Sequence, residues 1–179
     1  MLQNEFIIVR KFKVEDAKAL YDYLSLPETY LYEPGEAVSE AQAAQMCAER
    51  ARGDSFFAVC DRQSGTMVGH LYFQRCEPAE FLSWELGYIF NPRYQGLGYC
   101  TAGAKLLIDY AFRTLGAHRI EAHCNPHNVA SWRVLEKCGF TLEGSFKKKA
   151  FFRKDENGRP LWFDSRSYGL LDEDYLKAD

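Results

Sequence analysis

Residues 91–99, Asn-Pro-Arg-Tyr-Gln-Gly-Leu-Gly-Tyr, constrain this chain more than any other stretch. They join an apolar segment, residues 81–90, to a segment of helical character in which Gly96 and Gly98 stand just before the first turn. Such a turn leaves several main-chain N–H groups unpaired and pointing the same way, and the helix dipole adds partial positive charge there. The sequence therefore predicts a strand–turn–helix unit whose turn binds an anion, best a phosphate or pyrophosphate.

The side chains of this turn depart from two common phosphate-binding motifs. The dinucleotide-binding fingerprint requires a third glycine three residues after the second, where Thr101 stands. The P-loop requires lysine directly after its second glycine; Gly98 and Gly103 have the spacing, but Ala104 follows. The alternative that the chain is a nucleotide-dependent enzyme using this turn therefore lacks the side chains that define such motifs.

Length and composition predict one globular domain, residues 1–179. The chain has 22 basic and 25 acidic residues, and this balance argues against a dedicated nucleic-acid binder. No apolar run approaches the roughly 20 residues that cross a bilayer. The N-terminus lacks the basic start and apolar block of a secretory signal. We therefore expect a cytoplasmic protein with neither a nucleic-acid nor a membrane partner.

The cysteines and histidines do not follow a metal-binding pattern. The six cysteines are irregularly spaced without a Cys-x-x-Cys pair, which predicts free thiols and no zinc site. His118, His123 and His127 surround one predicted strand, but they lack rigid ligand spacing, so no metal is expected. Cys100 is the thiol best placed to react, because a helix N-terminus lowers a thiol pKa; a packing role is the preferred interpretation.

Hydrophobic periodicity predicts an α/β fold with a mixed, mostly antiparallel sheet and helices on both faces. The expected helices are residues 13–26, 39–52, 98–115 and 126–137. The expected strands are residues 6–12, 55–60, 67–75, 81–90, 119–124, 141–152 and 165–171. Short connections imply antiparallel neighbours, whereas the strand–helix–strand unit around the glycine turn implies a right-handed parallel crossover.

Three ordered blocks of residues resemble the GNAT N-acetyltransferases, in particular their RimJ/RimL-like branch. The first is similar to the family's central strand and acyl-CoA loop, the second to its following strand and helix, and the third to its C-terminal hairpin. The blocks are Trp84-Glu85-Leu86-Gly87-Tyr88 with Arg93-x-x-Gly96-x-Gly98; Arg119-Ile120-Glu121-Ala122 with Asn128-Val129-Ala130-Ser131 and Lys137-Cys138-Gly139-Phe140; and Asn157-Gly158-Arg159 with Asp164 and Tyr168.

The resemblance implies acetyl-CoA as donor and a primary amine as acceptor, either a protein N-terminus or a small molecule. It implies a splayed parallel strand pair whose gap takes the pantetheine arm, an oxyanion held by a main-chain N–H near Ile89, and a pyrophosphate on the amides of the glycine turn. A homodimer stays open. The residues implied for CoA binding are Tyr88, Ile89, Phe90, Arg93, Gln95, Gly96, Leu97, Gly98, Tyr99, Asn128 and Lys137.

Glu85 is the first candidate for the base that takes the proton of the attacking amine. Its strand is apolar on almost every side, and a carboxylate there is costly to desolvate unless it is paired or used. The alternative is a structural ion pair with Arg119 or His70. Glu121 is the second candidate base, although structural support beside the cofactor strand is its preferred interpretation.

The source of the proton for the departing thiolate is less evident. Many family members carry a tyrosine in the helix before the Gly-Phe of the second block, and Leu135 stands in that place here. Ser131, four residues earlier on the same helical face, is the candidate donor. Helix packing or a hydrogen bond to CoA are the alternatives for Ser131, and solvent could also supply the proton.

The missing tyrosine keeps a second function open, a non-catalytic domain of the same fold that binds or senses acyl-CoA. The acceptor is not fixed by the sequence. Five aromatic side chains are candidates for an acceptor pocket, although ordinary packing accounts for them as well. They are Tyr30, Tyr32, Phe151, Phe152 and Trp162.

Overall fold

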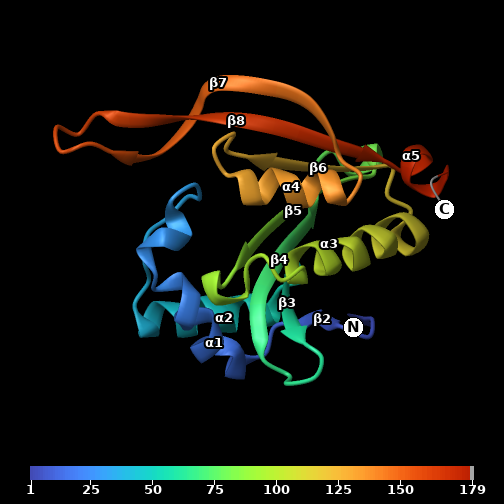
Figure 1. The fold of residues 1–179 in the computed structure, drawn as a ribbon, viewed down its shortest axis with the longest axis horizontal. Coiled ribbons are helices and arrows are strands. Elements are labelled where there is room, and N and C mark those ends of the chain that lie inside the picture. The colour runs from blue at the N-terminus through green and yellow to red at the C-terminus, as the bar shows by residue number, and fades with distance from the viewer. Residues whose placement is uncertain (178–179) are drawn as a thin grey trace.

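An eight-stranded sheet in the order β1-β2-β3-β4-β5-β6-β8-β7 organises the fold (Figure 1). The computed structural model describes residues 1–177. Its strands are β1 (Leu2–Gln3), β2 (Ile7–Lys11), β3 (Phe56–Asp61), β4 (Met67–Arg75), β5 (Ser83–Phe90), β6 (Arg119–Cys124), β7 (Thr141–Lys154) and β8 (Pro160–Leu171). Neighbouring strands pair antiparallel except β5 and β6, which are parallel. The mixed, mostly antiparallel sheet predicted from the sequence is confirmed.

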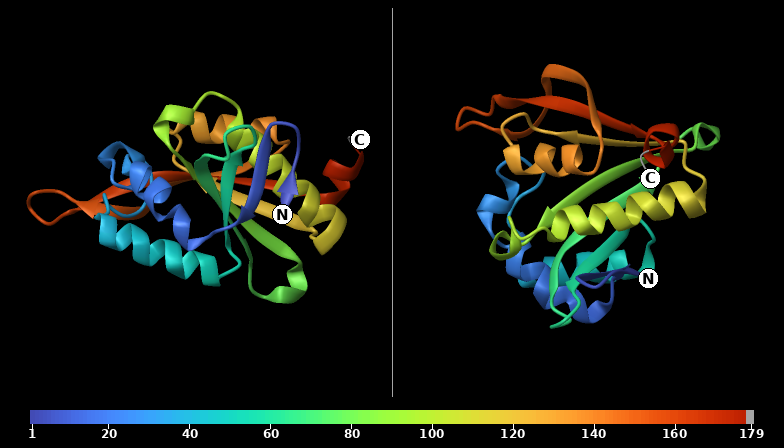
Figure 2. Two further views of the ribbon diagram at one scale, coloured as in Figure 1. Left: turned by 90° about the horizontal axis from the view of Figure 1, so that it is seen from below. Right: turned by 45° about the vertical axis from the view of Figure 1, so that its right-hand side comes forward.

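Helices cover both faces of this sheet (Figures 1 and 2). Those on one face are α1 (Ala17–Leu24) and α2 (Glu40–Arg52), and those on the other are α3 (Tyr99–Tyr110) and α4 (Val129–Lys137), with α5 (Asp172–Lys177) after the last strand. A π-helical turn at Ala111–Leu115 continues α3. Within residues 1–177, no helix combines the length and apolar character that crossing a bilayer requires.

Each face of the sheet buries its own hydrophobic core because strand side chains alternate between the two faces. Leu71 and Leu86 pack with Leu107 of α3 in one core. Leu20 of α1 and Cys47 of α2 contribute to the other. Side chains from the two faces of β5 therefore belong to different compartments, a separation on which the candidate site depends.

Several predicted boundaries move in the structure. The first helix begins as a 3₁₀ turn at Val14–Asp16 and ends at Leu24, and α4 starts at Val129 rather than at residue 126. The last strand starts at Pro160, not at residue 165, because the β7–β8 ladder continues into a protruding hairpin (Figure 1). Both faces of that hairpin are largely exposed, so its sequence lacks the alternation that identifies a half-buried strand.

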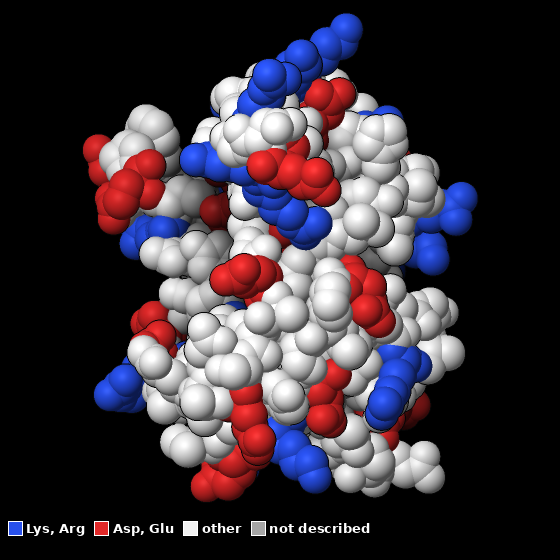
Figure 3. All heavy atoms as spheres, turned by 90° about the vertical axis from the view of Figure 1, so that its left-hand side faces the viewer, with Lys and Arg blue, Asp and Glu red and all other residues white. Residues whose placement is uncertain are grey.

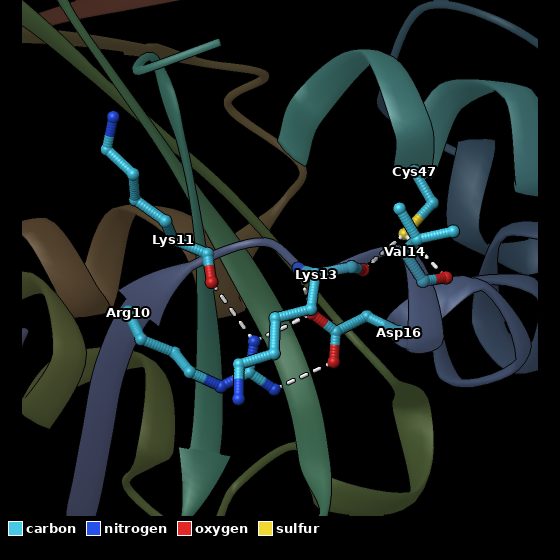
Figure 4. A network of polar contacts seen from close by, with 6 residues as sticks. All are labelled: Arg10, Lys11, Lys13, Val14, Asp16 and Cys47. Carbon is cyan, nitrogen blue, oxygen red and sulfur yellow. Dashed lines mark hydrogen bonds and ion pairs between the residues drawn. The ribbon is translucent and has the colours of Figure 1, made fainter. Parts of the chain in front are cut away.

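A buried ion pair fixes the chain where β2 leads into α1 (Figure 4). Both guanidinium nitrogens of Arg10 donate to the Asp16 carboxylate at 2.7 Å, and the Lys13 main-chain N–H donates to the same carboxylate at 2.8 Å. The thiol of Cys47 donates to the Lys13 carbonyl at 3.0 Å. These contacts connect β2, the 3₁₀ turn and α2 on the α1/α2 face of the sheet.

Candidate active site

β5 and β6 separate part-way along their length. Their parallel pairing runs from Ser83 opposite Arg119 to Glu85 opposite Glu121 and then stops, although β5 continues to Phe90. β5 stays paired with β4 throughout, and β6 with β8. The splayed parallel pair implied by the family resemblance is therefore present, with a gap that begins after Glu85.

The hydrogen-bonding alternation of β5 decides which main-chain groups face this gap. The N–H of Cys76 donates to the Ser83 carbonyl at 2.8 Å, and the N–H of Asn91 donates to the Val68 carbonyl at 3.0 Å. In an antiparallel ladder these bonds recur every second residue, so odd-numbered residues of β5 bond to β4. The even-numbered ones direct their N–H and C=O groups toward β6.

This alternation changes part of the expectation for the cofactor strand. Tyr88 and Phe90 present main-chain groups to the gap, whereas Ile89 lies opposite His70 and bonds toward β4. The carbonyl of Phe90 also accepts a hydrogen bond from Gln95 Nε2 at 3.1 Å. Tyr88 is therefore the residue next to Ile89 whose main-chain N–H faces the gap, and the expected oxyanion donor near Ile89 stays a prediction.

The glycine turn has open amides and an open approach. Gly96 and Gly98 have φ of +75° and +89°, left-handed values that favour glycine, and an added Cβ at either position meets no atom within 4 Å. No acceptor within residues 1–177 pairs with the N–H groups of residues 96–101, while the Ala102 N–H bonds back to the Gly98 carbonyl at 2.9 Å. These unpaired amides at the start of α3 fit a pyrophosphate.

The side chains of the turn hold it in place. Asn91 caps the preceding 3₁₀ turn, accepting from the Arg93 N–H at 3.0 Å. The hydroxyl of Tyr99 donates to the Asp61 carboxylate at 2.9 Å, and its ring stacks on Phe6 at 4.5 Å. The CoA contacts expected of Arg93, Gln95, Leu97 and Tyr99 stay predictions; their main chain forms this turn.

A cavity of about 670 Å³ opens on the α1/α2 face of the sheet, next to the gap. Its walls come from residues 30–34, from α2, from β4 and β5, and from the base of the β7–β8 hairpin. Tyr30, Tyr32 and Phe152 line it as the sequence suggested. Phe151 and Trp162 pack against each other on the exposed hairpin instead, with ring centroids 5.2 Å apart. Acidic and basic side chains are interspersed over this side of the molecule (Figure 3).

Glu85 lines this cavity at the point where the strands separate. Its side chain is half-buried and forms no ion pair or hydrogen bond within the described residues. The two partners considered from the sequence are engaged elsewhere, because Arg119 pairs with Glu143 and Glu121, and His70 contacts Tyr23. Within residues 1–177, Glu85 therefore lacks the structural ion pair considered from the sequence.

Glu33 is a candidate that the sequence analysis missed. It lies in the loop before α2, lines the same cavity and is half-buried. Burial raises the pKa of Glu33 to about 7. A carboxyl that titrates near neutral pH beside a cleft is typical of an active site. The sequence around Glu33, a glutamate before Pro-Gly, does not indicate a raised pKa, because the segments that bury its side chain are distant in the chain.

The second candidate base, Glu121, is occupied in a structural network. Its carboxylate lies 3.8 Å from Arg119 Nε and accepts from the Cys76 thiol at 3.7 Å. This supports the interpretation of Glu121 as structural. Burial raises the pKa of Cys100 well above its ordinary value, so the packing role preferred for that thiol agrees with the structure.

The start of α4 faces the gap from the α3 side. Ser131 Oγ lies 3.3 Å from the Tyr88 hydroxyl, which itself donates to the Ser131 carbonyl at 2.8 Å. Asn128 is the N-cap of α4 and accepts from the Ser131 N–H at 3.2 Å. Lys137 lies exposed in the last turn of the helix, and Leu135, in the usual tyrosine position, is buried. The roles expected of Asn128, Ser131 and Lys137 stay predictions.

Within residues 1–177, no group of three or more His, Cys, Asp or Glu side chains is arranged to hold a metal ion.

Comparison with known proteins decides the family. Residues 7–141 match the sequence model of the acetyltransferase (GNAT) domain. The chain belongs to the GNAT acetyltransferase family. YnaD, an uncharacterized N-acetyltransferase of Bacillus subtilis (strain 168), is 32% identical over 171 residues, which cover 94% of this chain and 95% of that protein. A GNAT-family acetyltransferase structure from Bacillus anthracis superposes with a TM-score of 0.87 at 31% identity, covering 96% of this chain and 98% of that one.

A third relative indicates the branch of the family. The ribosomal protein uS5-alanine N-acetyltransferase of Escherichia coli (strain K12) is 29% identical over 157 residues, which cover 82% of this chain and 80% of that protein. This relative is consistent with the predicted RimJ/RimL-like branch of the GNAT family. The chain is therefore an acetyl-CoA-dependent N-acetyltransferase, with acetyl-CoA as its co-substrate.

Proposed function

We propose that this GNAT enzyme acetylates the primary amine of a small molecule or of a flexible protein N-terminus, by direct attack within a ternary complex. The observation that carries the proposal is the cavity on the α1/α2 face, which meets the gap between β5 and β6 at Glu85. The open amides of residues 96–101 lie at the start of α3, on the other face. Donor and acceptor would then approach the gap from opposite faces of the sheet.

Glu85 would accept the proton of the attacking amine, directly or through one water. Its carboxylate has no partner within residues 1–177, is half-buried and lies next to the gap, which suits a general base. The nitrogen forms a bond to the acetyl carbon as the carbon–sulfur bond breaks, and its surplus proton passes to Glu85. The N–H of Tyr88 would stabilise negative charge on the acetyl oxygen.

Ser131 would relay a proton from solvent to the departing thiolate, taking up one proton as it gives one, so that no alkoxide remains. Its hydroxyl faces the gap side of α4 and is held beside the Tyr88 hydroxyl at 3.3 Å. Burial raises the pKa of Tyr88 well above its ordinary value, so this phenol stays protonated and keeps the Ser131 hydroxyl oriented. Because a thiol has a pKa of about 8.5, solvent can also deliver this proton.

The acceptor class rests on two observations. A cavity of about 670 Å³ admits a small amine or a few residues of an extended chain, but not a folded domain. The Escherichia coli relative is named for the alanine of a ribosomal protein, which makes a peptide N-terminus one class to test.

The deciding experiment measures thiol release from acetyl-CoA with a panel of polyamines, amino acids, peptides with free N-termini and aminoglycosides. Turnover of at least one amine, with the acetyl group on its nitrogen by mass spectrometry, is the expected result. Tight CoA binding with no turnover of any amine would instead favour the non-catalytic acyl-CoA sensor. That alternative draws its support from Leu135 in the usual tyrosine position.

A further inference from the structure

Arg50 is a cation held inside the cavity wall. It lies in the last turn of α2 and lines the cavity. Its guanidinium stacks on Phe56 at 4.2 Å from the ring centroid and lies 5.6 Å from that of Phe12. Two aromatic rings therefore fix the position of the charged group, and its side chain is half-buried.

The polar partners of Arg50 do not neutralise it. Its one hydrogen-bonding contact within residues 1–177 is His70 Nε2, at 3.4 Å. An arginine only donates, so this contact requires the lone pair on Nε2 and places the imidazole proton on Nδ1, 2.5 Å from the Tyr23 hydroxyl. Burial, together with the charge of Arg50, lowers the pKa of His70 well below its ordinary value, so the imidazole stays neutral.

No carboxylate of the described residues forms an ion pair with Arg50. Glu33, Glu85 and Asp164 line the same cavity, but none lies within the 4.0 Å that an ion pair requires. Burial lowers the pKa of Arg50, which records the cost of holding this charge away from water. A guanidinium has five N–H donors and can bind a carboxylate with two of them, and a partly buried cation without an anion is costly. Within residues 1–177, the Arg50 guanidinium therefore keeps donors that can bind a further anion.

The place of Arg50 limits where that anion sits on the acceptor. Its contact residue His70 lies directly opposite Ile89, the residue next to Tyr88 at the gap. Paired residues of an antiparallel ladder are about 5 Å apart, so the guanidinium lies on the order of 10 Å from the reacting atoms. The contact between guanidinium and carboxylate, the short spacer of the acceptor and the approach of its amine to the acetyl carbon together cover that distance. A long polyamine has no anion for this position.

We propose that Arg50 binds a carboxylate of the acceptor, and that the acceptor is therefore an amino acid or a similarly short amine that carries a carboxylate. This inference rests on the proposed function, because it assumes that the cavity is the acceptor site. Glu85 would face the amine and Arg50 the carboxylate, so the two ends of a zwitterion are recognised by opposite charges.

The test compares amino acids with their α-carboxamides as acceptors at a pH above the pKa of both amines, where the two differ mainly in the anionic group. For the wild type we expect kcat/KM at least about tenfold higher with the carboxylate. Arg50→Met, which keeps the volume against Phe56, should lower kcat/KM for the carboxylate about 10- to 100-fold through KM, and leave the carboxamide within about twofold. Arg50→Lys should restore part of the loss, since it keeps the charge but not the planar fork.

Arg52→Ala is the matched control, an exposed arginine of the same helix end, and should change neither acceptor. Thermal shift with CoA confirms that each variant is folded. Equal losses on carboxylate and carboxamide, or a wild-type preference for uncharged amines or polyamines, would overturn the role of Arg50.

A binding measurement separates this inference from the proposed function. N-acetyl amino acids and their amides are titrated into the protein–CoA complex by calorimetry. Should no amine be acetylated, the proposed function fails, yet preferential binding of the N-acetyl carboxylate that is lost in Arg50→Met would still support the site. Equal binding of carboxylate and amide would overturn the site even in an active enzyme.

Discussion

Tyr88 and Ser131 are joined by two hydrogen bonds across the point where β5 leaves β6, through the Ser131 carbonyl at 2.8 Å and the Ser131 hydroxyl at 3.3 Å. Tyr88 belongs to β5 and Ser131 to α4, so this pair joins the strand to the start of the helix beside the gap. Ser131→Ala should lower kcat about tenfold, because proton delivery passes to solvent, with the CoA dissociation constant unchanged.

Tyr88→Phe tests whether Tyr88 only orients the Ser131 hydroxyl, while Ser131 delivers the proton. Tyr88→Phe should lower kcat less than Ser131→Ala, and the double variant should resemble Ser131→Ala, because the two side chains act as a unit. Ser145→Ala on the exposed part of β7 is the control. Steady-state kinetics with saturating acetyl-CoA measures these effects, and full activity of Ser131→Ala would remove Ser131 from the mechanism.

We expect the glycine turn to be needed for CoA binding but not for folding. Gly96→Glu adds a side chain and a negative charge to the amides of residues 96–101, and its φ of +75° favours glycine. We expect CoA affinity to fall more than about 100-fold, because the variant opposes the pyrophosphate. Gly158→Glu is the matched control, since Gly158 has a φ of +76° in the distant hairpin turn and an equally open surround. Unchanged CoA affinity by calorimetry in Gly96→Glu would place the cofactor elsewhere.

Glu85 provides a test of the base. Glu85→Gln keeps the shape of the side chain but cannot take a proton, so kcat should fall about 100-fold with little change in CoA affinity. The loss should shrink at high pH, where more of the amine is already deprotonated in solution. Glu80→Gln, an exposed glutamate shortly before β5, is the control. A pH–rate profile of Glu85→Gln equal to that of the wild type would assign the base elsewhere.

Glu33 predicts a dependence of stability on pH. Burial raises the pKa of Glu33 to about 7, above its ordinary 4.5, so the folded state takes up a proton that the unfolded state does not between these values. The wild type therefore loses stability as pH rises through 7. Glu33→Gln should match the wild type near pH 4.5 and exceed it by roughly 1 kcal/mol at pH 8, a value reduced for partial exposure. Urea unfolding at both pH values measures this difference.

The control for Glu33 lies in the same loop. Glu36→Gln replaces an exposed carboxylate and should leave the pH dependence of the wild type intact. A difference between Glu33→Gln and the wild type that is equal at pH 4.5 and pH 8 would show that Glu33 does not titrate in this range.

Local signals account for the part of the site that the sequence predicts. The turn from Asn91 to Tyr99 is recognisable because its glycines, its strand and its helix are neighbours in the chain. The parallel crossover follows from the same unit, whereas the splayed strands are implied only by the family resemblance and the start of the gap after Glu85 comes from the structure. The sequence places the gap-facing amide only near Ile89, because the hydrogen-bonding phase of β5 is set by its pairing with β4, which the sequence of β5 alone does not contain.

The sequence suggests only three aromatic residues of the cavity on the α1/α2 face, because distant segments form the rest of it. Glu33, Arg50 and Ser165 come from a loop, a helix end and a hairpin strand, and each lies in a sequence context without a functional pattern. Arg50 follows Glu49 at the end of an ordinary amphipathic helix. Its charge is significant only because Phe12 and Phe56 enclose it, and these contacts join residues 38 and 6 positions away along the chain.

The ion pair of Arg10 with Asp16 predicts acid sensitivity at the base of the cavity face. Burial raises the pKa of Asp16, but hydrogen bonds from Arg10 and from the Lys13 N–H lower it more, so the net pKa lies below the ordinary 3.8. A carboxyl whose pKa is lowered by folding contributes stability at pH values above its pKa in the unfolded state. This contribution is lost as pH falls through its pKa in the folded state.

Asp16→Asn should therefore destabilise the fold by about 3 kcal/mol at pH 7 by leaving Arg10 unpaired. The deficit should narrow below pH 3.8, measured as urea unfolding at both pH values, while Asp22→Asn, an exposed change on α1, should have no comparable effect. A deficit that stays constant across this range would show that the ion pair does not contribute to stability.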